Sequence, residues 1–508
     1  MLDRLFSPRS IAVIGASKTV GKVGYLTLSN LVQSGFQGPI VPINSAGGEL
    51  FGLPVYKQLA DYPDAIDLVV IAVPAEMVPA AARDAVAKKA GAVVVVASGF
   101  KEAGPEGRAL EDELIAICQR GGVRLLGPNC LGVINTAIRM NASFSRRIPQ
   151  AGSMAIFSQS GALCTAMMDI ADERELGVSK AISIGNKADI TEVDVLEALA
   201  EDEDTRVIVG YLEDISDGDR FVKAAEAASS RKPVVILKAG TTAAGTRAAA
   251  NHTGVLVGKD TAYGAAFKRA GICRADTFDA LFDSATALAL QPTPKGDRVL
   301  IITNSGGSGT ISADAVEKAG LTVAPLGEEL ARQLRRALPD AAFIDNPIDI
   351  SAAAEPRHYA AAIDIVAAEG SFDAVLIVLA PQYMTEPAAT VRAIVAHLDE
   401  NMPVLAAFLG GGDIIPSRQE LAAAGLPFYD SPERAVTALK AMHEYGVWQR
   451  RPARQVVRFP VNRRRVERII YRRQRTDRLR RARSSPRTSS RPMVSRSSRA
   501  GSPPRPRR

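Results

Sequence analysis

The chain has 508 residues, of which 47% are hydrophobic and only 5% aromatic, so its core must be built mainly from Ala, Val, Ile and Leu. This length predicts about three or four domains, and no apolar run approaches the roughly 18 residues that span a bilayer. The 18 arginines and two acidic residues of segment 462–508 give that segment a net charge of +16, so the total of +7 leaves −9 on residues 1–461. The body of the chain is therefore mildly acidic, and one segment makes the protein basic.

The amino-terminal residues and the cysteines favour a cytoplasmic location. Residues 1–8 carry an acid and lead directly into a strand pattern, which is unlike a signal peptide. The four cysteines lack CxxC spacing and are too few for a disulfide framework. They are Cys118, Cys130, Cys164 and Cys273. We expect them to be reduced.

Five short apolar stretches between residues 10 and 126 each end in a turn of small residues and alternate with helical stretches. This pattern predicts a parallel sheet with helices on both faces, whose turns line one edge. The first turn, with Gly15, Ser17 and Lys22, is a glycine-rich strand-to-helix turn of the kind that holds phosphate, although its G-x5-G-x2-G spacing is not the dinucleotide fingerprint. The later turns contain Asn44, Pro74, Ser98 and Asn129. A nucleotide-like ligand is the expected occupant of this edge.

A second α/β unit contains a further anion-type turn. The strand pattern 154–157 leads into Ser158, Ser160 and Gly161 at a helix start, where free amides and roughly half a positive charge from the helix dipole favour an anion. A small turn with Asn186 follows, and a later strand pattern, 206–212, ends at Glu213.

His252 is one of only four histidines in the chain. It follows the strand pattern 233–237 and a segment of Gly, Thr and Ala, which predicts a mobile loop near the carboxyl edge of a sheet. A neutral imidazole can attack phosphorus and hold a phosphoryl group. Glu213, expected at the same edge, could accept the N–H of one ring nitrogen and leave the other free to react. A solvent-exposed histidine and a solvated strand-end acid remain the alternatives.

The third unit repeats the arrangement of strand, glycine-rich turn and helix. Its strand pattern, 298–303, leads into Gly306, Gly307, Ser308 and Gly309, which form a second expected anion site. Two such sites suit a histidine that is phosphorylated in one place and discharged in another. His358, His397 and His443 lie in or near helical patterns, and we expect them to be structural or surface residues.

These turns, in this order, resemble those of the NDP-forming acyl-CoA synthetases, relatives of succinyl-CoA synthetase. The resemblance rests on residues 15–17, 41–44, 72–74, 98–100 and 127–132 in the first unit, and on 211–213 and 251–254 in the second. It implies an α/β fold with a Rossmann-like CoA-binding domain at 1–140 and a flavodoxin-like domain at 150–290 that carries the phosphohistidine loop. A second flavodoxin-like, succinyl-CoA ligase-like domain would span 296–450.

The resemblance also implies roles for the residues of these turns. Coenzyme A would contact Gly15, Ser17, Lys22, Asn44, Pro74, Ser98 and Asn129. His252 would be the phosphohistidine, steadied by Glu213, with the two glycine-rich helix starts facing each other across it. Phosphate would contact Ser158, Ser160, Gly161, Asn186, Gly306, Gly307, Ser308 and Gly309.

The implied function is that of the CoA-ligase portion of an ADP-forming acyl-CoA synthetase of the acetate–CoA ligase type. It would interconvert acyl-CoA, phosphate and ADP with carboxylic acid, CoA and ATP through an acyl phosphate and phosphohistidine. ADP or ATP with Mg²⁺ would bind a separate ATP-grasp, beta-type partner, since this chain shows no such module, and we assign no metal site, membrane or nucleic acid to the chain itself. A homo-oligomer is compatible with this function, and a CoA-binding regulatory sensor or an inactive remnant of a longer synthetase remains an alternative.

Residues 451–508 are expected to form a linker and a disordered tail rich in Arg, Ser and Pro, because such a composition cannot bury a core. Family-like sequence continues to about residue 470. Two explanations of the tail stay open, an arm that binds nucleic acid through phosphate contacts and a loss of the original reading frame near residue 475. The lack of aromatic residues among the arginines of 478–508 favours the second.

Overall fold

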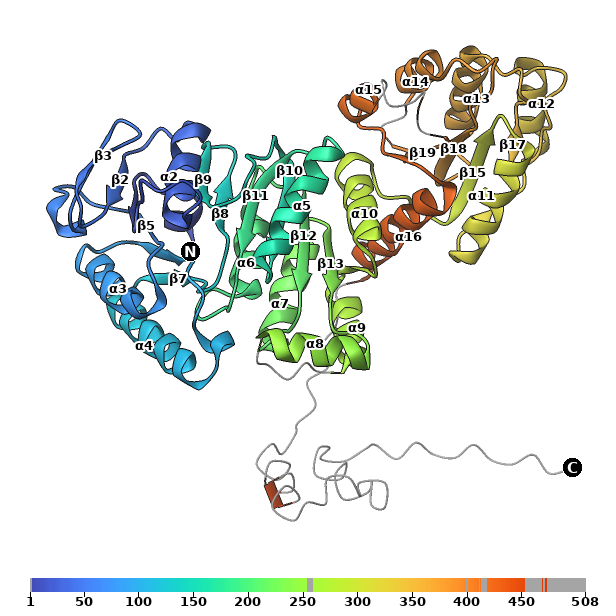
Figure 1. The fold of residues 1–508 in the computed structure, drawn as a ribbon. Helices are drawn as coiled ribbons and strands as arrows, with labels where there is room; N and C mark the ends of the chain where they lie inside the picture. The colour runs from blue at the N-terminus through green and yellow to red at the C-terminus, as the bar shows by residue number, and fades with distance from the viewer. Residues whose placement is uncertain are drawn as a thin grey trace, which may run out of the picture. The chain divides into compact units, whose positions relative to one another are not determined.

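The computed structural model describes residues 2–253, 259–398, 401–410, 412, 418–452, 468, 471 and 472. Residues 1–450 form one compact unit, and residues 451–508 form another, so most of the expected disordered tail lies outside the described residues. The first unit contains three α/β parts, each built on its own sheet (Figure 1). No helix among the described residues is long and apolar enough to cross a membrane.

The first sheet is parallel throughout, with strand order β2-β1-β5-β6-β7. Its strands are β1 (Ile11–Ile14), β2 (Ile40–Ile43), β5 (Leu68–Ile71), β6 (Ala92–Val95) and β7 (Arg124–Leu126), and its helical elements are α1 (Asp3–Phe6), α2 (Val23–Ser34), η1 (Leu59–Asp61), η2 (Ala75–Met77), α3 (Val78–Ala87), η3 (Lys101–Ala103) and α4 (Pro105–Gly121). A hairpin of β3 (Gly48–Leu50) and β4 (Leu53–Val55) follows β2. Successive strand residues enter two different cores: Ile11 and Val13 belong to one cluster and Ala12 to another. The sheet is therefore buried on both faces, as its continuous apolar runs predict.

Two glycines allow helix α2 to pack directly on the turn after β1. A Cβ on Gly24 would lie 2.0 Å from the carbonyl oxygen of Gly15, and one on Gly15 would lie 2.5 Å from the carbonyl oxygen of Ala72. Gly15 also has a φ of +92°, which disfavours any side chain. Gly15 is thus required by packing, whatever binds at this edge.

The second sheet has seven strands in the order β14-β13-β12-β10-β11-β8-β9. They are β8 (Gly132–Asn135), β9 (Met140–Ser143), β10 (Ala151–Ser158), β11 (Val178–Ser183), β12 (Val207–Leu212), β13 (Val234–Lys238) and β14 (Cys273–Ala275), and the helices are α5 (Gly161–Glu173), α6 (Glu192–Glu201), α7 (Gly218–Ser229), α8 (Ala243–Thr253), α9 (Asp260–Ala270) and α10 (Phe278–Leu290). Strands β8 and β9 are antiparallel additions to an otherwise parallel sheet. The second part therefore takes β8 and the first residue of β9 from the range 1–140 that we assigned to the first, and the first sheet itself ends at Leu126.

The third sheet is parallel in the order β16-β15-β18-β19-β20, and β17 also pairs with β15. Its strands are β15 (Arg298–Thr303), β16 (Thr322–Val323), β17 (Ile348–Asp349), β18 (Ala374–Leu379), β19 (Val404–Phe408) and β20 (Phe428–Tyr429), and its helices are α11 (Gly306–Lys318), α12 (Glu328–Ala337), α13 (Pro356–Glu369), α14 (Pro387–Ala396), α15 (Arg418–Ala423) and α16 (Pro432–Gln449). The predicted fold class, a Rossmann-like part followed by two flavodoxin-like parts, is confirmed.

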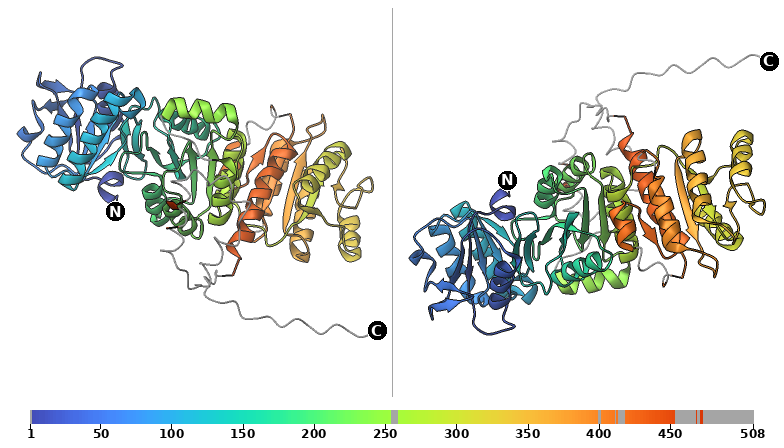
Figure 2. Two further views of the ribbon diagram at one scale, coloured as in Figure 1. Left: turned by 90° about the horizontal axis from the view of Figure 1, so that it is seen from below. Right: turned by 90° about the horizontal axis from the view of Figure 1, so that it is seen from above.

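The second and third parts are joined by helices α10 and α16, which pack against each other. Both views of Figure 2 show the orange-red α16 beside the yellow-green α10. One hydrophobic cluster includes Met168 of α5, Leu281 of α10, Met442 of α16 and Ile301 of β15. The two parts thus share a core, which loop composition at 291–296 does not reveal.

The amino edges of the second and third sheets lie on the same side of the joined parts. Near the end of α16, the Tyr445 hydroxyl donates to the carbonyl of Ser229 at the end of α7 (2.8 Å), and His443 contacts the carbonyl of Gly296, just before β15 (2.9 Å). At the end of α10, Gln291 accepts from the amide of Val404 at the start of β19 (2.9 Å). In Figure 1, helices α12 to α15 cover the upper face of the third sheet.

Candidate functional site

The five predicted turns of the first part lie along one edge of its parallel sheet. Asn44 fastens the turn after β1 to its own, because its amide donates to the carbonyl of Ala16 (2.6 Å) and its Oδ1 accepts from the amide of Ala46 (2.9 Å). The hydroxyl of half-buried Ser17 accepts from the amide of Thr19 (3.1 Å). Lys22 immediately precedes α2, and Pro74 precedes η2. These residues share an edge, as predicted.

The fourth and fifth turns are tied to each other. The amide of Asn129, a residue with a φ of +56°, donates to the carbonyl of Ala97 (2.9 Å), next to the exposed Ser98. Glu102 accepts from the amides of Gly99 (2.7 Å) and Phe100 (3.1 Å) through one carboxylate oxygen. The Ser98–Gly99 turn is therefore held by a carboxylate that sequence reasoning did not single out.

The turn after β10 forms the start of helix α5. The Ser158 hydroxyl donates to the carbonyl of Ser160 (2.7 Å), and the Ser160 hydroxyl accepts from the amide of Leu163 (3.4 Å) as a helix N-cap. Gly161 lies next to Ser183, whose buried hydroxyl has no hydrogen-bond partner among the described residues. A buried hydroxyl without a partner is costly, so a ligand oxygen at this helix start would satisfy it.

Glu213 directly follows β12 at the same edge and is buried. Its backbone amide donates to Oε1 of Gln159 (2.9 Å), which also accepts from the amide of Asp214 (3.2 Å). The Tyr211 hydroxyl donates to the Glu213 carboxylate (3.4 Å), and burial together with that carboxylate raises the pKa of Tyr211. Glu213 is thus a held carboxylate, which disfavours the alternative of a solvated strand-end acid.

A buried lysine lies beneath Glu213. The Lys238 ammonium donates to the carbonyls of Glu213 (2.7 Å) and Ala239, and it lies 4.2 Å from the centre of the Tyr263 ring. Burial lowers the pKa of Lys238 to about 8, against the opposing effect of Asp214. Lys238 joins the ends of β12 and β13 where helix α8 departs, and its position in a strand pattern gave no signal of this role.

The prediction that a loop carries His252 is wrong. Residues 243–253 form helix α8, and the Thr242 hydroxyl accepts from the amide of Gly245 (3.1 Å) near its start. Alanine has the highest helix propensity, and five alanines in eleven residues outweigh Gly245. The backbone of His252 lies in the last turn, whereas its side chain and residues 254–258 lie outside the described part of the chain. Helix α8 also contacts η3 of the first part.

The side chain of Asn186 is hydrogen-bonded to other protein side chains, whereas a phosphate ligand was expected. Its side-chain amide donates to Glu102 (2.6 Å) and Glu111 (2.8 Å), and its Oδ1 accepts from Asn129 (3.4 Å). A Cβ on the preceding Gly185 would lie 2.3 Å from the carbonyl oxygen of Pro128, so the two turns touch. Asn186 therefore joins the first and second parts.

The third glycine-rich turn follows β15 and forms the start of helix α11. The Ser308 hydroxyl pairs with Thr303 (2.8 Å), while Gly306 and Gly307 are exposed. The Asp349 carboxylate lies 3.3 Å from the position that a Cβ on Gly306 would occupy. Because the side chain of His252 lies outside the described part of the chain, the expectation that Gly306, Gly307, Ser308 and Gly309 complete its site stays a prediction.

The other three histidines contact protein groups, which fits the prediction that they are structural or surface residues. Nδ1 of His358 accepts from the amide of Glu355 (3.0 Å), and burial and Arg357 lower the pKa of His358. His397 contacts Asp364 (2.8 Å), and His443 contacts the carbonyl of Gly296 (2.9 Å).

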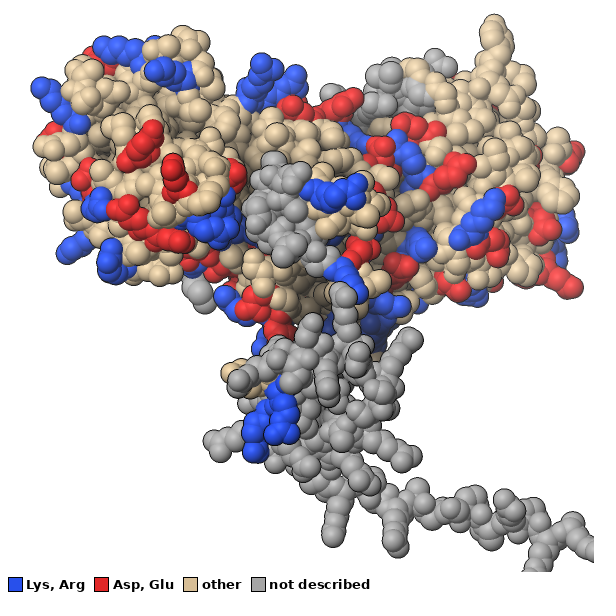
Figure 3. Space-filling model, turned by 60° about the horizontal axis from the view of Figure 1, so that its bottom comes forward, with Lys and Arg blue, Asp and Glu red and all other residues tan. Residues whose placement is uncertain are grey.

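Charged side chains are interspersed over the described surface in Figure 3, with basic and acidic groups alternating on this face. This mixture fits the net negative charge of residues 1–461. A continuous basic stripe, the usual footprint of nucleic-acid binding, is not seen on the described part of this face.

Family models match all three parts. A CoA binding domain matches residues 9–136, a succinyl-CoA ligase like flavodoxin domain matches 151–288 and a ligase-CoA domain matches 299–450. The chain is 38% identical over 455 residues to the ADP-forming acetate–CoA ligase I subunit alpha of Pyrococcus furiosus, covering 88% of this chain and 98% of that one. This chain belongs to the ADP-forming acetate–CoA ligase family.

Members of this ADP-forming acetate–CoA ligase family are acid–thiol ligases. The 4-hydroxybutyrate–CoA ligase of Nitrosopumilus maritimus is 35% identical over 471 residues, which cover 92% of this chain and 67% of that relative. The dinucleotide-forming acetyl-CoA synthetase 1 of Ca. Korarchaeum cryptofilum, solved in complex with phosphate and ADP, superposes with a TM-score of 0.85 at 36% identity and covers 89% of this chain and 100% of that one. The predicted family, fold and ligase class are confirmed.

Proposed function

We propose that this chain is the alpha-type, CoA-ligase component of an ADP-forming acyl-CoA synthetase and that His252 carries the phosphoryl group. The observation that carries the proposal is the shared edge of the second sheet. The start of α5, buried Glu213, the end of β13 before α8 and the Ser183 hydroxyl, which has no partner within the described ranges, come together there. The family membership supports the same assignment.

In the proposed reaction, phosphate at the start of α5 attacks the thioester carbonyl of acyl-CoA, and the C–S bond breaks to release CoA. A nitrogen of His252 then attacks phosphorus, and the carboxylic acid leaves as its carboxylate. Glu213 would accept the N–H of the other ring nitrogen and stabilise the charge on the phosphorylated ring. The helix start and the hydroxyls of Ser158, Ser160 and Ser183 would neutralise charge on the phosphoryl oxygens, which is most of the catalysis that such a transfer requires.

The phosphoryl group would finally pass to ADP, held with Mg²⁺ on a separate ATP-grasp partner. Support for a separate partner comes from the Pyrococcus relative, which is named as a subunit alpha and has nearly the same extent as this chain. We further propose that the glycine-rich start of α11 takes part in the phosphoryl-transfer site as the second anion site. We propose cytoplasmic coenzyme A and acyl-CoA as the substrates of the first sheet edge.

Incubation of the full chain with acetyl-CoA and ³²P-phosphate tests the proposal. We expect an acid-labile, alkali-stable label on the wild type and none on His252→Ala, whereas His358→Ala, a matched surface histidine change, should label normally. Repeating the assay with 4-hydroxybutyryl-CoA would define the acyl preference. CoA binding without any label would overturn the ligase assignment and favour a CoA-binding regulatory module.

A further inference from the structure

A continuous polar connection runs between the two sheet edges that the proposed reaction uses. At its first end, Glu102 holds the amides of Gly99 and Phe100, and its second oxygen accepts from the side chain of Asn186 (2.6 Å). Burial would raise the pKa of Glu102, but the hydrogen bonds from Asn186 and Gly99 hold it below the usual value. Glu102 is thus an ionised carboxylate that links the Ser98–Gly99 turn to the second part.

The next residue, Lys187, continues the connection in the other direction. Its ammonium lies 3.2 Å from Asp214 and 3.2 Å from Glu192, and it donates to the carbonyl of Asp214 (2.9 Å). The side chains of all three residues are at most 5% exposed. Lys187 also has a φ of +57°, a conformation that a side-chain-bearing residue adopts only where its surroundings hold it.

Asp214 completes the connection through Gln159. The Asp214 carboxylate accepts from the Gln159 side-chain amide, and the other end of that amide accepts from the backbone of Glu213 and Asp214. Burial would raise the pKa of Asp214, but Lys187 and Gln159 lower it below its ordinary value. Gln159 lies between Ser158 and Ser160, so the connection ends at both the phosphate turn and Glu213.

From these contacts we infer that Lys187 is a positioning residue that couples occupancy of the CoA edge to the geometry of the phosphoryl-transfer edge. Burying an ion triad contributes little to stability because its desolvation penalty offsets the Coulombic gain. What the triad does supply is a fixed distance between two turns that must hold the two reactants. When CoA orders the Ser98–Gly99 turn, Glu102, Asn186 and Lys187 would transmit that order to Asp214, Gln159 and Glu213.

Lys187→Met tests the coupling, because methionine keeps most of the length of the lysine side chain and removes its charge. Lys180→Met is the matched control: Lys180 is equally buried on the preceding strand and pairs with Asp202 (2.6 Å) and Asp204 (3.3 Å), away from both turns. Hydrogen–deuterium exchange of the amides of 211–217 would be compared with and without CoA. We expect CoA to slow this exchange in the wild type and in Lys180→Met, but not in Lys187→Met.

Asn186→Ala cuts the same connection at its other end and should also abolish the response, which covers the case in which Lys187→Met does not fold. The inference is overturned if CoA protects 211–217 equally in Lys187→Met, or if the wild type shows no protection while it binds CoA.

A second measurement rests on the proposed function. The rate of His252 labelling from acetyl-CoA and phosphate should fall roughly 100-fold in Lys187→Met, the loss expected for a small misplacement of reacting groups, while the Kd for CoA changes less than about threefold. Equal labelling rates in Lys187→Met and Lys180→Met would contradict the coupling. A wild type that takes no label would contradict the proposed function but not the coupling, because the exchange experiment tests the coupling independently.

Discussion

At the scale of single residues, the site depends on buried ionisable groups whose partners come from neighbouring strands. The backbone of Glu213 is held by Gln159 and Lys238, and its carboxylate accepts from Tyr211. Lys238 in turn lies against Tyr263, so one cation touches two strand ends and helix α9. Such groups fix the carboxylate that we propose for the phosphohistidine.

The lowered pKa of Lys238 predicts a pH-dependent contribution to stability. Its pKa falls from 10.5 to about 8 on folding, so between these values the unfolded chain binds a proton that the folded chain does not. Stability therefore rises with pH across this window, by up to roughly 3 kcal/mol. Urea unfolding of the wild type and of Lys238→Met at pH 7.5, 9 and 10 should show the gain in the wild type alone. Parallel pH profiles would contradict the prediction.

At the scale of elements, the strand-to-helix turns are the parts that local sequence determines. The Ser160 N-cap of α5 and the Ser431 N-cap of α16 have the same hydroxyl-to-amide distance of 3.4 Å. Only the first is at the proposed phosphate edge, so the two helices form a natural comparison.

We expect Ser160→Ala and Ser431→Ala each to lower the free energy of unfolding by about 1 kcal/mol, the usual loss for a missing N-cap. Ser160→Ala should also raise the phosphate concentration needed for half-maximal labelling, whereas Ser431→Ala should not. Unfolding curves and a phosphate titration measure the two effects. Similar phosphate dependence in both variants would remove Ser160 from the site.

The sequence predicted these turns but not their partners. The turns that contain Gly15, Ser158 and Gly306 each lie between an apolar strand and the start of a helix. This pattern can be recognised within about a dozen residues of sequence. The hydrogen bond between Asn186 and Glu102 joins residues 84 positions apart, so no local sequence pattern predicts it. The predicted loop at 243–253 is wrong because the five alanines of this segment favour a helix more than Gly245 and its two threonines oppose it.

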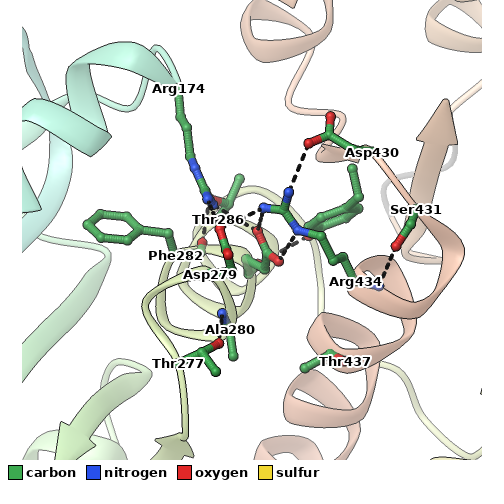
Figure 4. A network of polar contacts seen from close by, with 12 residues as sticks. Arg174, Thr277, Asp279, Ala280, Phe282, Thr286, Asp430, Ser431, Arg434 and Thr437 are labelled. Carbon is green, nitrogen blue, oxygen red and sulfur yellow. Dashed lines mark hydrogen bonds and ion pairs between the residues drawn. The ribbon is translucent and has the colours of Figure 1, made fainter. Parts of the chain in front are cut away.

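At the scale of the whole described molecule, the joined second and third parts depend on one buried carboxylate. Asp283 of α10 is 3% exposed and accepts hydrogen bonds from Arg174 (2.8 Å) and Arg434 (2.7 Å). Figure 4 shows these two arginines pointing toward each other over α10. Beside it lies a cavity of about 400 Å³ whose lining includes Leu176, Phe278 and Phe428. Since it lies at the far end of α5, roughly 20 Å from the phosphate turn by helix length, we assign it to the junction rather than to the site.

Asp283→Ala should lower the free energy of unfolding by about 3 kcal/mol, because it leaves two arginines without their shared buried partner. Asp430→Ala removes a partner of Arg434 that is 63% exposed and should cost less than about 1 kcal/mol. Thermal unfolding measures both Tm values. A difference smaller than the error would show that the shared apolar core alone joins the parts.

All four cysteines are buried, and burial raises the pKa of each thiol to about 12. At neutral pH the native fold therefore offers maleimide reagents almost no thiolate. A cysteine placed at exposed Ala103 of η3 and another at exposed Ala248 of α8 would be the reactive pair in an otherwise silent background. Paired spectroscopic labels at these positions would follow the histidine-bearing helix through turnover without any native thiol being removed first.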